Sequence, residues 1–345
     1  MSQIPIIDVS PLHTLTESQP DASDPFIAET TNQIANACKT YGFFAITNHG
    51  VDSEIIRSAW IESSNFFDLN KSVKEEVCMA EDYPYGYENY ESLGTELKNG
   101  KSNSKILKKQ VSRLVDSKET FSIGPADTTL SGMPGRRFPN VPTFERALTD
   151  YYSAMENLAK TLFRGLALAL QLDSNWFLQE GVFDDGHQCA LRVLNYPELQ
   201  YSSSEEVPIR AGAHTDYGAM TILKSGGLGL QLCLSQEDEQ WIDVPHLEDA
   251  FVINLGDLMQ RWTNDRWRST LHRVVAVSDN NDEKKAAFNS CRRQSIAFFV
   301  NMNGEANVVP FESCVDEDNP MKYHAIKASE HLMQRHLRSM GRVKA

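Results

Sequence analysis

Short apolar runs alternate with helical repeats in the first part of the chain. Residues 4–9 (IPIIDV) and 43–48 (FFAITN) are rich in β-branched and aromatic side chains, which is typical of strands. Between them, the apolar residues of segment 24–42 recur at helical spacing and end at a glycine, so a helix is expected there. A second helical stretch is expected over about residues 52–80.

The longest helical pattern covers residues 142–182. Its apolar positions recur three or four residues apart and form one stripe: Leu148, Tyr152, Met155, Leu158, Leu162, Leu166 and Leu170. A stripe of this kind predicts a helix that lies with one face on the core.

From residue 188 to residue 310 the pattern changes to short apolar runs separated by Gly, Asn and Asp. These runs are ALRVLNYP, AMTILK, LGLQLCL, AFVINLG, TLHRVVAV and SIAFFVN. Their spacing predicts an antiparallel β-sandwich or small barrel. With a C-terminal helix expected over about residues 321–338, the chain is predicted to be mainly β with flanking helices.

Composition and charge narrow the range of functions. The 345 residues carry a net charge of −14, which disfavours binding to nucleic acid or to a membrane surface. No apolar run approaches the roughly 18 residues of a membrane-spanning helix, and no signal peptide is visible. The six cysteines are widely spaced, which suits a reducing compartment, so a cytoplasmic location is expected.

One segment departs from the acidic average. Residues 98–118 contain seven basic residues and one acidic residue. Two interpretations stay open: a solvated, exposed segment, or a mobile lid that attracts an anionic substrate.

Two histidines and a carboxylate form the candidate metal site. In AGAHTDYG, His214 and Asp216 are two residues apart, so on a strand both side chains point to the same side. A second pair of this kind, His246 and Glu248, follows a proline in a predicted turn. His272, in the β-rich run STLHRVV, would supply the third ligand. Two histidines and one carboxylate on one face of a metal form the facial triad of non-haem Fe(II) oxygenases.

A candidate carboxylate-binding pair lies in RRQSIAFFVN. Arg293 and Ser295 are two residues apart and share one face of a predicted strand. A guanidinium binds a carboxylate through two hydrogen bonds, and an adjacent hydroxyl can donate a third. If the pair is buried, it implies a carboxylate ligand, because an unpaired buried charge is costly.

Together these motifs resemble the 2-oxoglutarate/Fe(II)-dependent dioxygenases, in the branch similar to isopenicillin N synthase. The similar segments extend over most of the chain: IPIIDVS, YGFFAITNHGV, KETFSIG, LRVLNYPE, RAGAHTDYGAMTIL, NLGDLMQRWTNDRWRSTLHRV and RQSIAFF. The resemblance implies a distorted double-stranded β-helix (jelly-roll) core, with iron held by His214, Asp216 and His272.

The resemblance also implies a cosubstrate site. Arg293 and Ser295 would hold the distal carboxylate of 2-oxoglutarate, and Tyr196 would add a hydroxyl to that cosubstrate or to the substrate. A polar insertion upstream leaves Arg292 as a second candidate, but the strand phase with Ser295 favours Arg293.

The reaction that the resemblance implies is oxidation of an unactivated C–H bond of a small metabolite by Fe(II), 2-oxoglutarate and O2, with release of succinate and CO2. Hydroxylation, desaturation and oxidative ring closure are all compatible with it. The alternatives are a 2-oxoglutarate-independent iron oxidase like isopenicillin N synthase, a metal hydrolase, and an inactive binding protein. The sequence determines neither the substrate nor the oligomeric state.

The motifs are distributed over what we interpret as one dioxygenase domain, residues 1–345. We expect a mixed helical and strand part over residues 1–182 with a possible lid at 81–118, a jelly-roll core over 183–312, and a C-terminal helical part over 313–345.

Strand phase adds two candidate substrate contacts. If the alternation of His214 and Asp216 continues without a bulge, Lys224 faces the same interior. By the same alternation Arg192 shares a face with Tyr196. Because a cation that points into a barrel needs an anionic partner, the substrate is predicted to carry an anionic group, most simply a carboxylate.

Overall fold

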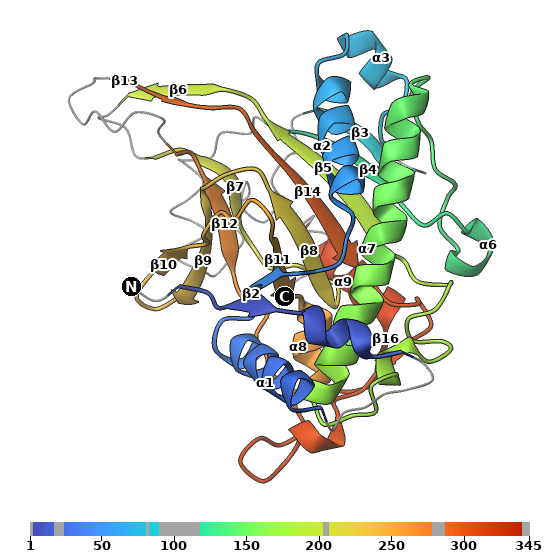
Figure 1. Cartoon of the computed structure of the whole chain (residues 1–345), viewed down its shortest axis with the longest axis vertical. Coiled ribbons are helices and arrows are strands. Elements are labelled where there is room, and N and C mark those ends of the chain that lie inside the picture. The colour runs from blue at the N-terminus through green and yellow to red at the C-terminus, as the bar shows by residue number, and fades with distance from the viewer. Residues whose placement is uncertain are drawn as a thin grey trace.

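A sandwich of two β-sheets forms the centre of the protein, and helices cover the outer face of the larger sheet (Figure 1). The computed structural model describes residues 3–16, 24–80, 83–89, 118–202, 207–277 and 287–339. The strand order is β1-β2-β11-β8-β14-β5-β4-β3 in the larger sheet and β10-β9-β12-β7 in the smaller one. Neighbouring strands are antiparallel, except that β1 pairs with β2 in parallel.

The strands have the following bounds. The larger sheet contains β1 (Ile6–Asp8), β2 (Phe43–Thr47), β3 (Gly86–Asn89), β4 (Glu119–Ile123), β5 (Ala190–Tyr196), β8 (Met220–Ser225), β11 (Phe251–Leu255) and β14 (Arg293–Val300). The smaller sheet contains β7 (Ile209–His214), β9 (Leu230–Ser235), β10 (Gln240–Asp243) and β12 (His272–Val275). Two short ribbons pair β6 (Leu199–Ser202) with β13 (Ala287–Ser290), and β15 (Asn307–Val308) with β16 (Ile326–Lys327).

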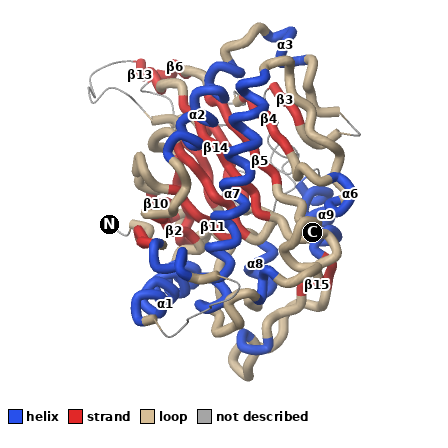
Figure 2. The backbone as a smooth tube through the Cα atoms, turned by 45° about the vertical axis from the view of Figure 1, so that its right-hand side comes forward, coloured by secondary structure: helices blue, strands red, loops and turns tan. Residues whose placement is uncertain are grey.

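The long helix α7 (Pro142–Ala169) runs across the larger sheet beside α2 (Ser53–Phe67), as Figure 2 shows. All seven residues of the predicted apolar stripe are buried, which confirms the core-facing helix. The helix ends before Gln171, whose φ of 61° is left-handed, so the prediction of a helix to residue 182 is wrong.

The remaining helices are short or lie at the ends of the chain. They are α1 (Pro25–Thr40), α3 (Lys71–Glu75), α6 (Thr128–Ser131), α8 (Asp257–Trp262), α9 (Ala328–Ser339) and 3-10 helices at Ser10–Thr14, Trp176–Leu178 and Glu312–Cys314. The stretch predicted over residues 52–80 is therefore two helices, and the C-terminal helix starts later than residue 321, because a loop and β16 precede it.

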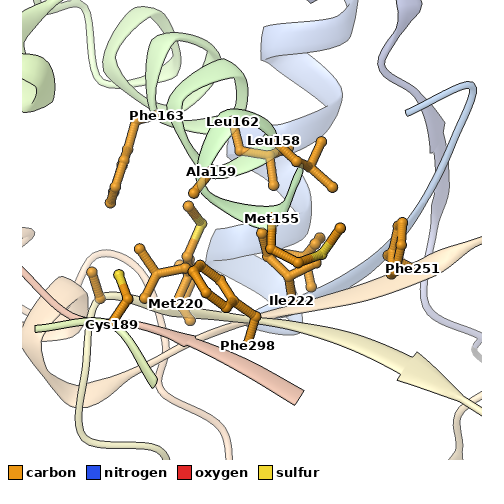
Figure 3. Packing of buried hydrophobic residues seen from close by; sticks show 14 of the residues in the cluster. Met155, Leu158, Ala159, Leu162, Phe163, Cys189, Met220, Ile222, Phe251 and Phe298 are labelled. Carbon is orange, nitrogen blue, oxygen red and sulfur yellow. The ribbon is translucent and has the colours of Figure 1, made fainter. Parts of the chain in front are cut away.

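Side chains of the larger sheet alternate between a helix-facing and a sandwich-facing side. Met220, Ile222 and Phe298 pack against α7, and Met155 and Leu158 of that helix belong to the same apolar cluster (Figure 3). The intervening residues of these strands face the smaller sheet, where a second apolar cluster forms. The predicted β-core with flanking helices is thus confirmed, and the space between the two sheets is where the candidate ligands lie.

Two predictions are not tested by this fold. Apart from Lys118, the basic segment 98–118 lies outside the described residues, so the lid and the solvated segment both stay predictions. The division into a single domain also stays a prediction.

None of the helices in the described ranges is long and apolar enough to cross a membrane.

Candidate metal centre

The three predicted ligands converge at one end of the smaller sheet. His214 is the last residue of β7 and pairs directly with His272, the first residue of β12. Asp216 lies two residues beyond β7, in the turn that leads to β8. Its Oδ1 atom is 3.8 Å from the Nε2 atom of each histidine. The three ligand atoms lie within 4.8 Å of one another, close enough to share one metal ion.

Backbone carbonyls orient both imidazoles. The Nδ1 atom of His214 is 2.8 Å from the carbonyl oxygen of Gly212, and Nδ1 of His272 is 3.0 Å from that of Thr270. Because a carbonyl only accepts, each Nδ1 carries the proton and donates it. In the neutral form of each ring, the Nε2 atom then keeps its lone pair for a metal, which is the usual supporting arrangement around metal-binding histidines.

The Asp216 carboxylate is oriented from the larger sheet. Its Oδ2 atom accepts hydrogen bonds from the Thr221 hydroxyl at 2.5 Å and the Asn254 amide at 2.7 Å. These two residues are direct neighbours across β8 and β11. Burial alone would raise the pKa of Asp216, but the two histidines and these hydrogen bonds hold it below its ordinary value. The carboxylate is thus charged, and its Oδ1 atom is left for the metal.

His214 is neutral at physiological pH. Its side chain is 46% exposed. Even so, desolvation of the ring by the surrounding protein lowers its pKa to about 4, and the neighbouring His272 adds to this effect. A neutral imidazole is the form that binds a metal.

Two glycines allow the Asp216 turn to pack closely against its neighbours, Gly256 at the start of α8 and Gly218 against Asn301. A Cβ atom on Gly256 would lie 2.2 Å from the carbonyl oxygen of Gly218, and one on Gly218 would lie 2.3 Å from the Asn301 side chain. Both distances exclude a larger residue without movement of the chain. The close approach lets the amides of Asp257 and Leu258 donate to the carbonyl oxygens of Asp216 and Gly218.

This donor set fits Fe(II). Two imidazoles and one carboxylate on one side of an ion leave positions open for further ligands, which is the pattern of non-haem iron oxygenases. Among the residues that the structure describes, it is the only such cluster of three or more side chains. The alternative pair, His246 and Glu248, is not part of it, in agreement with the predicted turn.

The predicted carboxylate-binding residues also lie together, on strands β5 and β14. Arg293 donates from its Nη2 atom to Ser225 at 2.8 Å, and its Nη1 atom is 3.5 Å from the Ser295 hydroxyl. Tyr196 pairs with Arg293 across the two strands, and its ring centre lies 5.3 Å from the guanidinium. The structure therefore brings Arg293, Ser295 and Tyr196 into one group.

Arg292 lies on the opposite face of the sheet. It donates to the Asn195 side chain at 2.7 Å and forms an ion pair with Asp68, also at 2.7 Å. Because both of its partners are on the helix side, Arg292 is not part of the group around Arg293.

The two candidate substrate contacts differ in position. Arg192 is on the sandwich-facing side of β5 as predicted, with its Nε atom 3.0 Å from the Ser122 hydroxyl and its guanidinium 5.9 Å from the Phe299 ring. Lys224 is not there: it shares the helix-facing side of β8 with Ile222, and its amine donates to the backbone carbonyl of Glu248.

The prediction for Lys224 is wrong because the strand does not continue. Residues 215–219 form an irregular turn between β7 and β8, so the alternation that starts at His214 is lost. As a result Thr221, and not its neighbour Met220, faces Asp216.

Comparison with known proteins identifies the family. Residues 188–302 match the 2OG-Fe(II) oxygenase superfamily, and residues 4–141 match the N-terminal region called non-haem dioxygenase in morphine synthesis. A 2-oxoglutarate-dependent dioxygenase, caaD of Aspergillus niger, is 33% identical over 79% of this chain and 80% of its own. This chain belongs to the 2OG-Fe(II) oxygenase superfamily.

Other members of the superfamily match nearly the whole chain. A homoarginine-6-hydroxylase of Oryza sativa is 28% identical over 96% of both chains. The structure of a full-length Neurospora crassa protein in complex with alpha-KG and thymine has a TM-score of 0.76 at 27% identity, over 97% of both chains. The protein is thus a Fe(II)- and 2-oxoglutarate-dependent dioxygenase with the double-stranded β-helix core of this superfamily, as predicted, and the hydrolase and binding-protein alternatives lose their support.

Sequence reasoning missed the residues that support the ligands. Thr221 and Asn254 are the clearest case, because each is a buried polar residue within an apolar run, AMTILK or AFVINLG. That pattern is a usable signal, since a buried polar side chain needs a hydrogen-bond partner. Its partner here is Asp216.

Proposed function

We propose that this dioxygenase oxidises a C–H bond of a small, carboxylate-bearing metabolite, with iron held by His214, Asp216 and His272. The observation that carries the proposal is the convergence of these three side chains. Each is oriented by a hydrogen bond at the atom that does not face the other two: Nδ1 of each histidine and Oδ2 of Asp216. When bound, iron and 2-oxoglutarate supply, with O2, the oxidising power that an unactivated C–H bond requires, and succinate and CO2 are released.

In this proposal the cosubstrate is held by its distal carboxylate. Arg293 and Ser295 donate to that carboxylate, and Tyr196 lies against the guanidinium. In the described part of the chain, Arg293 contacts hydroxyls, a backbone carbonyl and the Tyr196 ring, but no carboxylate. Since an arginine prefers a carboxylate that it can bind with two hydrogen bonds, this supports an external acid as its partner.

Arg192 is the candidate for the substrate carboxylate. In the sheet register Arg192 of β5 pairs with Ala297 of β14, and Ala297 pairs with Leu223 of β8. Thr221, which donates a hydrogen bond to Asp216, lies two residues before Leu223 on the same strand. Two strand spacings of about 4.8 Å therefore separate β5 from the strand of Thr221. At this separation Arg192 can hold one end of a small molecule whose other end reaches the iron.

The relatives do not define the substrate class by themselves. One is named for hydroxylation of homoarginine, an amino acid with a carboxylate, and another binds thymine, which has none. The carboxylate is therefore inferred from Arg192 and not from the family.

The test compares substitutions of Arg192 and Lys224, the two cations that strand phase predicts as substrate contacts. A metabolite panel, screened by thermal stabilisation and then by substrate-stimulated succinate formation, supplies a substrate. Arg192→Met is expected to raise the KM for that substrate at least tenfold and to leave the affinity for 2-oxoglutarate unchanged. Lys224→Met, on the opposite face of the sheet, is the control. An unchanged KM in Arg192→Met, or a substrate without an acidic group, contradicts the proposal.

A further inference from the structure

We propose that Arg335, on the C-terminal helix α9, is a positioning residue for Asp216. The proposal rests on the metal triad of the proposed function. Asp216 lies between Thr215 and Tyr217 in the irregular turn after β7, and Arg335 contacts both of these neighbours. Figure 1 shows α9 in the region of α8, the helix whose first residues also contact this turn.

The guanidinium of Arg335 makes three contacts around the turn. Its Nε atom is 2.6 Å from Oδ2 of Asp257, an ion pair without the alignment of a hydrogen bond. Its Nη2 atom donates to the Thr215 hydroxyl at 3.1 Å, and its carbon lies 5.0 Å from the centre of the Tyr217 ring. The planar fork of an arginine can serve three partners at once, whereas a lysine cannot.

Asp257 connects the arginine to the metal ligand. Its backbone amide donates to the carbonyl oxygen of Asp216 at 2.8 Å, and its carboxylate accepts from Thr215 at 3.3 Å. The Asp257 side chain is only 18% exposed, so this carboxylate requires a nearby cation. Arg335 is that cation.

A second residue of α9 supports the same turn. His331 lies one helical turn before Arg335 on the same face of α9, and its Nε2 atom is 3.2 Å from the carbonyl oxygen of Tyr217. The turn that carries Asp216 is therefore held by both α8 and α9.

The position of Asp216 depends on these contacts because residues 215–219 lack the regular strand pairing that fixes His214 and His272. The matched oxygenase segment ends at residue 302, so α9 lies outside it. The inference is that the C-terminal helix, although distant in sequence, sets the geometry of one of the three metal ligands.

The test measures metal affinity and not only turnover. Mn(II) is titrated into the metal-free full chain by anaerobic calorimetry. Arg335→Met is expected to weaken Mn(II) binding at least tenfold, as for other residues that support metal ligands, and Arg335→Lys is expected to be intermediate. The control is Arg266→Met, which removes a more exposed arginine–aspartate ion pair with Asp316, and it is expected to bind Mn(II) like the wild type.

Mn(II) affinity equal to the wild type in a folded Arg335→Met protein overturns the inference. If that variant does not fold, Thr215→Val decides, since it removes the hydroxyl through which Arg335 and its ion-pair partner Asp257 hold the turn: weaker Mn(II) binding supports the inference and unchanged binding overturns it. If neither the wild type nor His214→Ala binds Mn(II), the result contradicts the proposed function instead.

Discussion

The two oxygens of the Asp216 carboxylate are used differently. Oδ2 receives the hydrogen bonds of Thr221 and Asn254, so that Oδ1 faces the two histidines. These bonds fix the rotation of the carboxylate. Metal affinity should therefore depend on residues that never touch the metal.

Two buried threonines of the larger sheet allow a matched test. Thr221→Val removes a hydrogen bond to Asp216 and is expected to weaken Mn(II) binding about tenfold or more. Thr120→Val, on β4, removes a buried hydroxyl that has no hydrogen-bond partner in the described part of the chain, so Mn(II) binding should not change. Calorimetric titration of both variants measures the difference, and equal affinities would show that Thr221 has no such role.

Arg292 and Arg293 allow a matched test of which arginine binds 2-oxoglutarate. Loss of one partner of a buried charge pair costs about 2–5 kcal/mol, a factor of roughly thirty or more in affinity. Arg293→Leu should therefore raise the Kd for 2-oxoglutarate by that factor, whereas Arg292→Leu should change it little. Equal losses of 2-oxoglutarate affinity, measured anaerobically in the presence of Mn(II), would refute the assignment.

Residue types, spacing and strand context were sufficient to predict that His214, Asp216 and His272 come together. Strand phase correctly predicted that Arg192 lies on the same face as Tyr196, since β5 is regular from Ala190 to Tyr196. It failed for Lys224, because an irregular turn cannot be recognised from alternation alone.

At the scale of elements, a buried network joins α3, β3, β4 and β5 behind the candidate cosubstrate site. Glu119 accepts from Lys74 and from the Tyr87 hydroxyl, both at 2.6 Å, and from Asn195 at 3.2 Å. Burial alone would raise the pKa of Glu119, but the hydrogen bonds from Lys74 and Tyr87 outweigh it and hold the pKa below its ordinary value of 4.5.

This network predicts a pH-dependent stability. A carboxyl whose pKa is lowered by folding stabilises the protein above pH 4.5 and loses that contribution as the pH falls through the lowered folded-state value. Glu119→Gln should therefore reduce the free energy of unfolding by about 1–3 kcal/mol at pH 7, and this difference from the wild type should shrink under acid.

Urea unfolding at a series of pH values measures this effect. Glu54→Gln is the control, because Glu54 forms a solvent-exposed ion pair with Arg57 on α2, and such pairs contribute little. A difference between wild type and Glu119→Gln that stays constant down to the lowest pH would contradict the explanation.

Element boundaries were predictable where one physical signal dominated. The stripe of α7 identified a helix because one face of this helix is buried against the core. Its C-terminal end was missed, since apolar residues continue into the 3-10 helix at Trp176–Leu178 and obscure the break at Gln171.

At the scale of the whole molecule, the metal centre lies between the two sheets. The smaller sheet supplies His214 and His272, the larger sheet supplies Thr221 and Asn254, and Asp216 lies in the turn between β7 and β8. Metal binding is therefore expected to be coupled to the packing of the two sheets. The sequence alone predicted a sandwich or small barrel, but pairing across β7 and β12, and the contact of α9 with the Asp216 turn, are long-range contacts that no local pattern reports.

The most direct test of this account is the Fe(II)-dependent conversion of 2-oxoglutarate into succinate by the wild type and by Asp216→Ala. The control is Asp316→Ala, which removes an exposed carboxylate. We expect succinate from the wild type only when Fe(II) and O2 are present, an unchanged rate in the control, and at least a hundredfold lower rate in Asp216→Ala. Succinate formation without Fe(II), or at the wild-type rate in Asp216→Ala, would contradict the account.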